Sequence, residues 1–158
     1  MYKDSLDMRG HVKYDLFDEF GNIKQSFETA NTVTELHDAV IAQQARLGES
    51  GVTVIGWIDF GTGTGQGSSD TTLDTVITEA RIGVSKATAA GGDDNDLVVY
   101  ATVAAGEYTA TINEAGLFRG KRTANMMCYD DNSASGLNIN KGATDTLAIT
   151  WTITYGSS

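Results

Sequence analysis

The stretch from Thr146 to Tyr155 constrains the fold more than any other part of the sequence. Apolar side chains alternate there with small ones, mostly threonine, without interruption. A period of two is that of a β-strand, in which successive side chains point to opposite faces. β-branched and aromatic residues also favour strands. We therefore predict a strand over 146–155 whose apolar face is Leu147, Ile149, Trp151, Ile153 and Tyr155.

Shorter stretches of the same kind precede it. Residues 12–16 and 23–27 flank a turn at 18–22 and predict a hairpin, and 18 glycines with no proline supply further turns. Other strands are expected at 52–60, 80–85, 97–103, 107–112, 116–118 and 125–129. Many short strands predict an all-β domain, a β-sandwich or jelly roll, over 11–158. The polar residues 1–10 are expected to form a flexible N-terminal arm.

One amphipathic helix is predicted within this β-rich chain, at about 32–47. Thr32 and Glu35 have the spacing of a capping box, in which each side chain bonds a free backbone N–H of the first turn. Apolar residues then recur on one helical face, and Gly48 is placed to end the helix. His37 lies outside the apolar face, so we expect it to be solvated. That face is Val33, Leu36, Val40 and Leu47.

Charge and cysteine content exclude several classes of protein. The formal net charge is −10, from 21 acidic and 11 basic residues, which disfavours binding to the phosphates of nucleic acid. No apolar run approaches the length of a membrane span, and the first residues lack the apolar core of a signal peptide. The single Cys128 has no partner for an internal disulfide and is expected to be a buried thiol.

Candidate chemical sites are weak in this sequence. The glycine-rich residues 61–69 read as a flexible loop, and they lack the Lys-Ser/Thr pair of a phosphate-binding loop. Asp93, Asp94 and Asp96 could hold a cation through oxygen ligands, but a solvated turn is the favoured interpretation and the question stays open. The same interpretation, a solvated turn, is favoured for Asp130 and Asp131. His11 and His37 have no accompanying nucleophile motif. We expect no enzyme activity, no catalytic residues, no cofactor and no metal.

Three segments together resemble small structural proteins of tailed bacteriophages. They are NEAGLF at 113–118, NKGATDTL at 140–147 running into ITWTI at 149–153, and IDFGTGTG at 58–65 followed by TTL. The resemblance spans residues 27–155 in order and carries over no catalytic residue. It departs from the pattern at MMCYDD, where such proteins have a more aliphatic strand.

The residues of these segments are expected to define the fold rather than bind a ligand. Glu114 would accept backbone N–H bonds and lock a corner between two strands, and Gly116 would allow a tight chain reversal. Lys141 and Asp145 bracket a turn before the last strand, where they could form a local ion pair. Trp151 belongs to the core face of that strand.

The resemblance implies a virion structural protein, assembled in the bacterial cytoplasm. The favoured role is a capsid decoration, or cement, protein that forms a homo-oligomer, preferably a trimer, and contacts the major capsid protein or other virion proteins, without nucleic acid or membrane. The N-terminal arm is a candidate to order against a neighbour. The alternatives are a tail component, such as a fibre-attached or tail-tip module, and a host-glycan-binding module.

A glycan-binding module would expose aromatic side chains, for which Trp57, Trp151, Tyr100 and Tyr108 are available. Trp151 falls on an apolar strand face and Trp57 is expected to do so, which argues that both belong to the core.

Overall fold

The computed structural model describes residues 8–37, 55–88 and 96–155, and β-strands dominate them. The strands are β1 (Met8–Phe17), β2 (Ile23–Val33), β3 (Trp57–Gly61), β4 (Ile82–Gly83), β5 (Ser85–Thr88), β6 (Asp96–Val103), β7 (Ala110–Ile112), β8 (Glu114–Phe118), β9 (Met126–Asp131), β10 (Ile139–Lys141) and β11 (Thr146–Tyr155). A one-turn helix, α2 (Asn132–Ser135), follows β9. The prediction of an all-β fold is confirmed.

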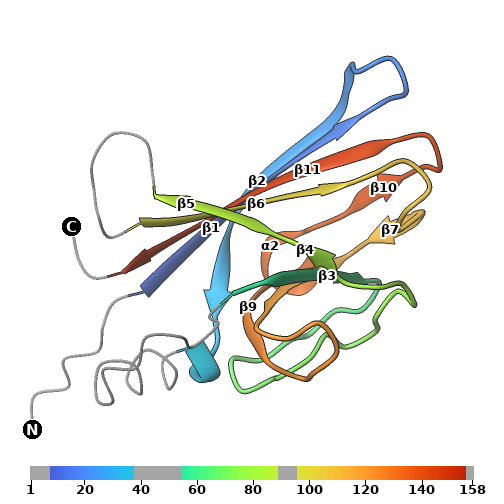
Figure 1. The fold of residues 1–158 in the computed structure, drawn as a ribbon. Coiled ribbons are helices and arrows are strands. Elements are labelled where there is room, and N and C mark those ends of the chain that lie inside the picture. Colours follow the sequence, from blue (N-terminus) through green and yellow to red (C-terminus); the bar gives the residue numbers. More distant parts are fainter. Residues whose placement is uncertain (1–7, 38–54, 89–95, 156–158) are drawn as a thin grey trace, which may run out of the picture.

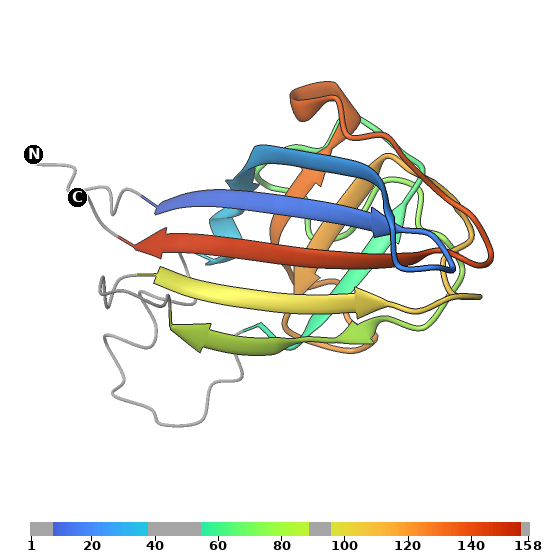
Figure 2. The same cartoon turned by 90° about the horizontal axis from the view of Figure 1, so that it is seen from above.

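Nine of these strands form one antiparallel sheet in the order β4-β3-β8-β9-β2-β1-β11-β6-β5, and β7 pairs with β10 beside it. The sheet folds over on itself into two layers, as Figures 1 and 2 show. Strands β1, β11, β6 and β5 form one layer, and β3, β8 and β9 cross beneath them at a steep angle. This is a sandwich-like or barrel-like arrangement with one continuous core.

Two strand connections carry the sheet from one layer to the other. β2 pairs with β1 as far as Asn31, and its last residues, Thr32 and Val33, pair with β9. At the opposite edge only Val84 separates β4, which pairs with β3, from β5, which pairs with β6. The sheet is therefore nearly closed, which leaves few unpaired edges.

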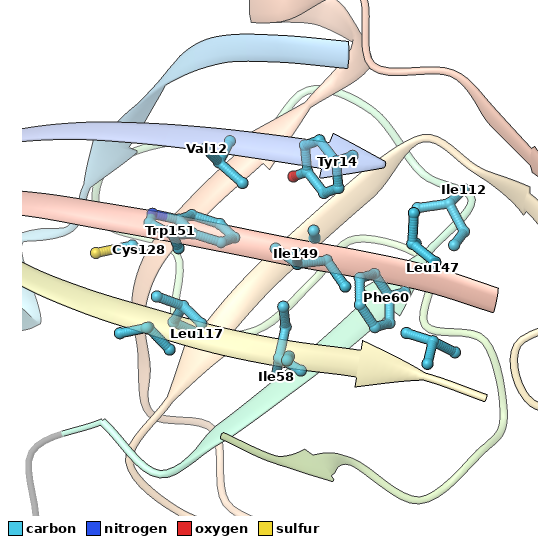
Figure 3. Packing of buried hydrophobic residues seen from close by; sticks show 14 of the residues in the cluster. Val12, Tyr14, Ile58, Phe60, Ile112, Leu117, Cys128, Leu147, Ile149 and Trp151 are labelled. Atoms are coloured by element: carbon cyan, nitrogen blue, oxygen red, sulfur yellow. The ribbon is translucent and has the colours of Figure 1, made fainter. Parts of the chain in front are cut away.

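The core lies between the layers, and β11 runs through its centre. Its apolar face is buried from Leu147 to Ile153, while the threonine face is half-buried, so the predicted strand and its inward face are confirmed. β11 pairs along its whole length with β1, and from Leu147 to Thr154 with β6. Figure 3 shows its side chains meeting those of β1, β3 and β8. The labelled core residues include Val12, Tyr14, Ile58, Phe60, Leu117, Ile149 and Trp151.

The predicted helix does not begin where the capping pattern placed it. Thr32 and Val33 belong to β2, because their backbones pair with Tyr129 and Cys128 of β9. Helical structure covers 35–37, and the backbone N–H of His37 bonds the carbonyl of Thr34. Residues 38–54, where the rest of the helix was predicted, lie outside the described residues. Strand pairing at 32–33 thus prevails over the local capping signal.

The last residues of the predicted arm belong to the sheet. β1 begins at Met8 and pairs with Tyr155 there, and Gly10 lies opposite Ile153. Residues 8–10 are therefore part of the sheet, and residues 1–7 lie outside the described part of the chain.

Other predicted boundaries shift for similar reasons. β3 begins at Trp57 rather than at residue 52, although 52–54 lie outside the described residues. The strand predicted at 107–112 is confined to β7, because Tyr108 has a φ of +46°, which breaks an extended chain. β10 and α2 were not predicted, since three or four residues carry too little pattern.

Candidate functional site

A polar pocket of about 390 Å³ lies where β3, the approach to β4 and the β8–β9 loop meet. These three segments are distant in the sequence, and the sheet brings them together. The pocket is lined by Asp59, Glu79, Ala80, Arg81, Lys121 and Arg122.

Arg81 forms one wall of the pocket and is held on every side. Its Nε lies 3.1 Å from Oδ2 of Asp59, and its Nη1 donates to the carbonyls of Gly120 and Thr123, both at 2.7 Å. Its guanidinium also stacks 3.5 Å from the ring centroid of Phe118. A planar guanidinium can make these contacts at once, which a lysine ammonium cannot. Arg81 therefore fixes the shape of the β8–β9 loop.

Tyr108 supports the pocket from inside. Its hydroxyl donates to Asp59 at 2.9 Å, and its backbone N–H donates to Glu79 at 2.8 Å. Burial, with the Asp59 carboxylate second, holds the pKa of Tyr108 far above its usual value. A bulky residue at positive φ is strained, and such strain persists only where surrounding contacts impose it. Both oxygens of the buried Asp59 are thus occupied by interior partners, whereas the exposed Glu79 bonds the interior through one oxygen.

The open side of the pocket is cationic. Lys121 and Arg122 are exposed, and the Lys121 ammonium lies 5.3 Å from the ring centroid of Trp57. Asp59 pairs with the interior Arg81, whereas Glu79 is exposed, so the pocket presents two cations and one carboxylate to solvent in a chain of net charge −10. Such a pocket favours anionic groups, carboxylates among them.

Glu114 lies elsewhere, beneath the glycine-rich loop. It is fully buried in β8, and its two carboxylate oxygens accept four hydrogen bonds of 2.7–3.1 Å. Charge-assisted bonds of this kind offset the cost of burying a carboxylate. Glu114 therefore organises the loop rather than a corner between two strands. The donors are the backbone N–H groups of Gly63, Asp74 and Thr75 and the side-chain amide of Gln66.

Asp131 is a second buried carboxylate on the same loop, so the interpretation of Asp130 and Asp131 as a solvated turn is wrong. Its Oδ2 accepts from the backbone N–H groups of Gly65 and Gln66, and its Oδ1 caps α2 by accepting from Ala134. The cap has a sequence signal, because an aspartate before Asn-Ser-Ala is a common helix start. The segment 61–69, predicted to be flexible, is therefore tied down by two carboxylates.

Gly116 is not at a chain reversal, so that prediction is wrong. It lies inside β8, opposite Asp59 on one side and Tyr129 on the other. A Cβ there would lie 2.9 Å from both the Met126 sulfur and the Phe118 ring. Glycine is required by close packing, because β8 is buried on both faces.

Lys141 and Asp145 do bracket a turn, but each has another partner. Asp145 accepts from the backbone N–H of Gly142 at 2.8 Å and from Lys24 at 2.7 Å, and the bond from Lys24 is the main cause of its lowered pKa. The Lys141 ammonium is buried and donates to the carbonyls of Ala104 and Glu107, and burial lowers its pKa. In place of the predicted ion pair, Asp145 binds Lys24 and Lys141 binds two backbone carbonyls, and both contacts hold the turn.

His37 is fully buried, so the prediction of a solvated histidine is wrong. Its Nε2 lies 2.9 Å from the Tyr155 hydroxyl and its Nδ1 3.6 Å from the Cys128 sulfur. Burial lowers the pKa of His37, which keeps the ring neutral. Cys128 is buried, as predicted. The imidazole ring therefore lies between Cys128 of β9 and Tyr155 of β11.

Asp130 places a carboxylate inside the core. Its Oδ2 accepts from the Tyr14 hydroxyl at 2.9 Å, and its Oδ1 has no hydrogen-bond partner. Burial raises the pKa of Asp130 from 3.8 to about 6. This residue is a source of pH-dependent stability rather than a site of chemistry.

The tip of the β1–β2 hairpin is the second surface feature. Phe20 is 81% exposed and Ile23 is 62% exposed, which is unusual for large apolar side chains so close together. Oδ1 of Asp18 accepts from the backbone N–H groups of Phe20 and Asn22, at 2.9 and 2.8 Å, so the turn that carries them is well defined. The bonds from Asn22 are the main cause of the lowered pKa of Asp18.

Of the four aromatics considered for glycan binding, Trp151 and Tyr108 are fully buried and Trp57 is partly buried. Tyr100 is 44% exposed and lines a hollow of about 410 Å³ beside β4 and β5. The remaining lining residues are Gly83, Val84, Ser85, Ala101 and Thr102.

Within 8–37, 55–88 and 96–155, no group of three or more metal-ligating side chains is arranged to hold an ion. Asp93 and Asp94 fall outside these ranges, and Asp96 begins β6. In the same described ranges, no helix has the length and apolarity needed to cross a membrane.

Comparison with known proteins gives no relative for this chain: no family model, curated protein or solved structure matches it.

Proposed function

We propose that this chain is a structural protein of a tailed-bacteriophage particle, acting as a capsid decoration protein by binding and without catalysis. The observation that carries the proposal is the place of its phage-like segments in the fold. Glu114 and Asp145 hold loops, Lys141 anchors a turn and Trp151 fills the core. These roles in holding the scaffold support a protein that works by binding rather than by catalysis.

Two further features support this role. The nearly closed sheet presents few free edges, so copies can meet through side chains without uncontrolled strand pairing. Exposed apolar residues on the hairpin tip supply a defined contact. In the proposed role, each contact is weak and gains strength from repetition over the symmetric shell.

Reconstitution tests the proposal. Particles of the phage that encodes the chain are prepared with its gene deleted and mixed with the purified protein. We expect saturable co-sedimentation with the particles and an increase in the temperature at which they release DNA. Binding to purified tails and none to heads would replace decoration by the tail-component alternative. No binding to either would refute a virion role.

The glycan-binding alternative is favoured by one observation, the hollow beside Tyr100. An exposed aromatic ring at the edge of a shallow hollow can stack on a sugar. A glycan array with the wild type and Tyr100→Ala tests it: binding that the substitution abolishes would support this function, and no binding would exclude it.

A further inference from the structure

The hairpin tip and the rim of the cationic pocket carry exposed groups of opposite charge. The tip carries Phe20 and Ile23 exposed beside the acidic Asp18 and Glu19. The pocket opens between the exposed cations Lys121 and Arg122. We infer that the β1–β2 tip of one copy docks into the cationic pocket of a second copy. This inference rests on the proposed function, in which copies of the chain bind one another.

The distribution of charge is the first argument. The chain has 11 basic residues, and Arg119, Lys121 and Arg122 lie within four positions. The charge of Arg81 is balanced by Asp59, so the exposed Lys121 and Arg122 exceed the one exposed carboxylate of the pocket, Glu79. Two exposed cations at one rim can attract an acidic element of another molecule.

The chemistry of the tip is the second argument. The pocket offers a lysine and an arginine rather than an apolar floor, and an exposed phenylalanine ring binds such cations through its face. The Glu19 carboxylate next to it is exposed and can pair with Arg122. The Asp18 bonds hold the turn in one shape, so little conformational entropy is lost when it docks.

The placement of the two surfaces is the third argument. Figures 1 and 2 show the hairpin tip well away from the β8–β9 loop that carries Lys121 and Arg122. One copy therefore cannot fill its own pocket, and the contact joins two different surfaces of two copies. A head-to-tail contact of this kind gives a ring where its rotation closes, for which the expected trimer is one solution, and an open chain where it does not.

Photocrosslinking tests which occupant the tip meets. Benzoylphenylalanine replaces Phe20 in the full chain, and isotopically heavy and light copies are mixed before irradiation. The expected product joins position 20 of one copy to residues 79–81 or 119–122 of another. Crosslinks to any other segment, or products only within one copy, would overturn the inference.

Charge exchange tests the pairing itself. Glu19→Arg and Arg122→Glu each place like charges together, and each is expected to weaken self-association in sedimentation equilibrium by about tenfold or more. The double variant restores opposite charges and is expected to recover most of the loss. Glu28→Arg, on the same hairpin but away from its tip, is the matched control and should change little. Unchanged association in the single variants, or no recovery in the double variant, contradicts the docking.

Failure here is distinguishable from failure of the proposed function. A chain that binds particles in reconstitution but shows no charge exchange keeps its virion role and loses this contact. A chain that self-associates through the tip but binds neither heads nor tails keeps the contact and loses the virion role.

Discussion

Single buried carboxylates contribute to this fold in opposite ways. Glu114 accepts four hydrogen bonds and holds the glycine-rich loop, whereas Asp130 accepts one from Tyr14 and leaves an oxygen without a partner. A buried charge is stabilising only when its hydrogen bonds offset its desolvation. One acid therefore supports the structure and the other makes it sensitive to pH.

Glu114→Gln is expected to lower the free energy of unfolding by roughly 2–4 kcal/mol. The amide nitrogen of glutamine replaces one carboxylate oxygen, and it cannot accept the hydrogen bonds that the neighbouring N–H groups donate to that oxygen. Urea denaturation measures this change, and limited proteolysis should cut the loop at 61–69 faster. Glu28→Gln, whose side chain is 56% exposed, is the control. A stability equal to that of the control would contradict the role given to Glu114.

Asp130 predicts how stability changes with pH. Its folded pKa, about 6, lies above its ordinary value of 3.8, so the folded state binds this proton more tightly than the unfolded chain. Protonated Asp130 therefore adds about 2 to 3 kcal/mol to the free energy of unfolding below pH 3.8, and this contribution is lost as the pH rises through 6.

Asp130→Asn should remove that part of the pH dependence. Urea unfolding of both proteins between pH 4 and 8 measures the difference, which we expect to grow in favour of the variant up to about pH 7. Parallel curves for the two proteins would mean that Asp130 does not titrate in the folded core.

At the scale of elements, a strand could be predicted from the sequence where buried and exposed side chains alternate along it. β11 and β1 each bury one face, so their alternation is visible in the sequence. β8 and β9 are buried at every position, so they show no alternation, and Gly116 was read as a turn. The end of β2 was missed because its partner, Cys128 in β9, is far away in the chain.

The candidate site was less predictable than the fold. Glu114 was identified, but its donors lie 39–51 residues away along the chain, and nothing local specifies them. Arg81, Lys121 and Arg122 carried no motif, and only the crossing of β3 with the β8–β9 loop joins them into a pocket. The hairpin was predicted, yet the exposure of Phe20 at its tip depends on how far the hairpin projects beyond the sheet.

Packing within β8 makes a prediction at the same scale. Gly116→Ala is expected to destabilise the protein by about 1–3 kcal/mol, because its Cβ would meet Met126, Phe118 and Leu73 at 2.9–3.1 Å. Thermal unfolding measures the loss. Gly67→Ala is the matched control, since the nearest atom to its Cβ is 3.7 Å away in Asp70. Equal stability of the two variants would show that β8 has room for a side chain.

At the scale of the whole molecule, the chain is a nearly closed β-unit, and we propose that two of its surfaces pair between copies. The tip and the pocket lie on different parts of the chain, so one contact between copies leaves a free tip and a free pocket for others. Repeated over a shell, such contacts reinforce one another. Because they involve charges at the surface, we expect particle binding to weaken as salt is raised.

Cryo-electron microscopy of the intact particle, with the chain traced into the density, tests the central claim most directly. We expect density for this β-unit on the outer face of the capsid, with copies grouped around local symmetry axes. Density confined to the tail would contradict the decoration role and assign the chain to the tail, and absence of the chain from the particle would contradict a virion role altogether.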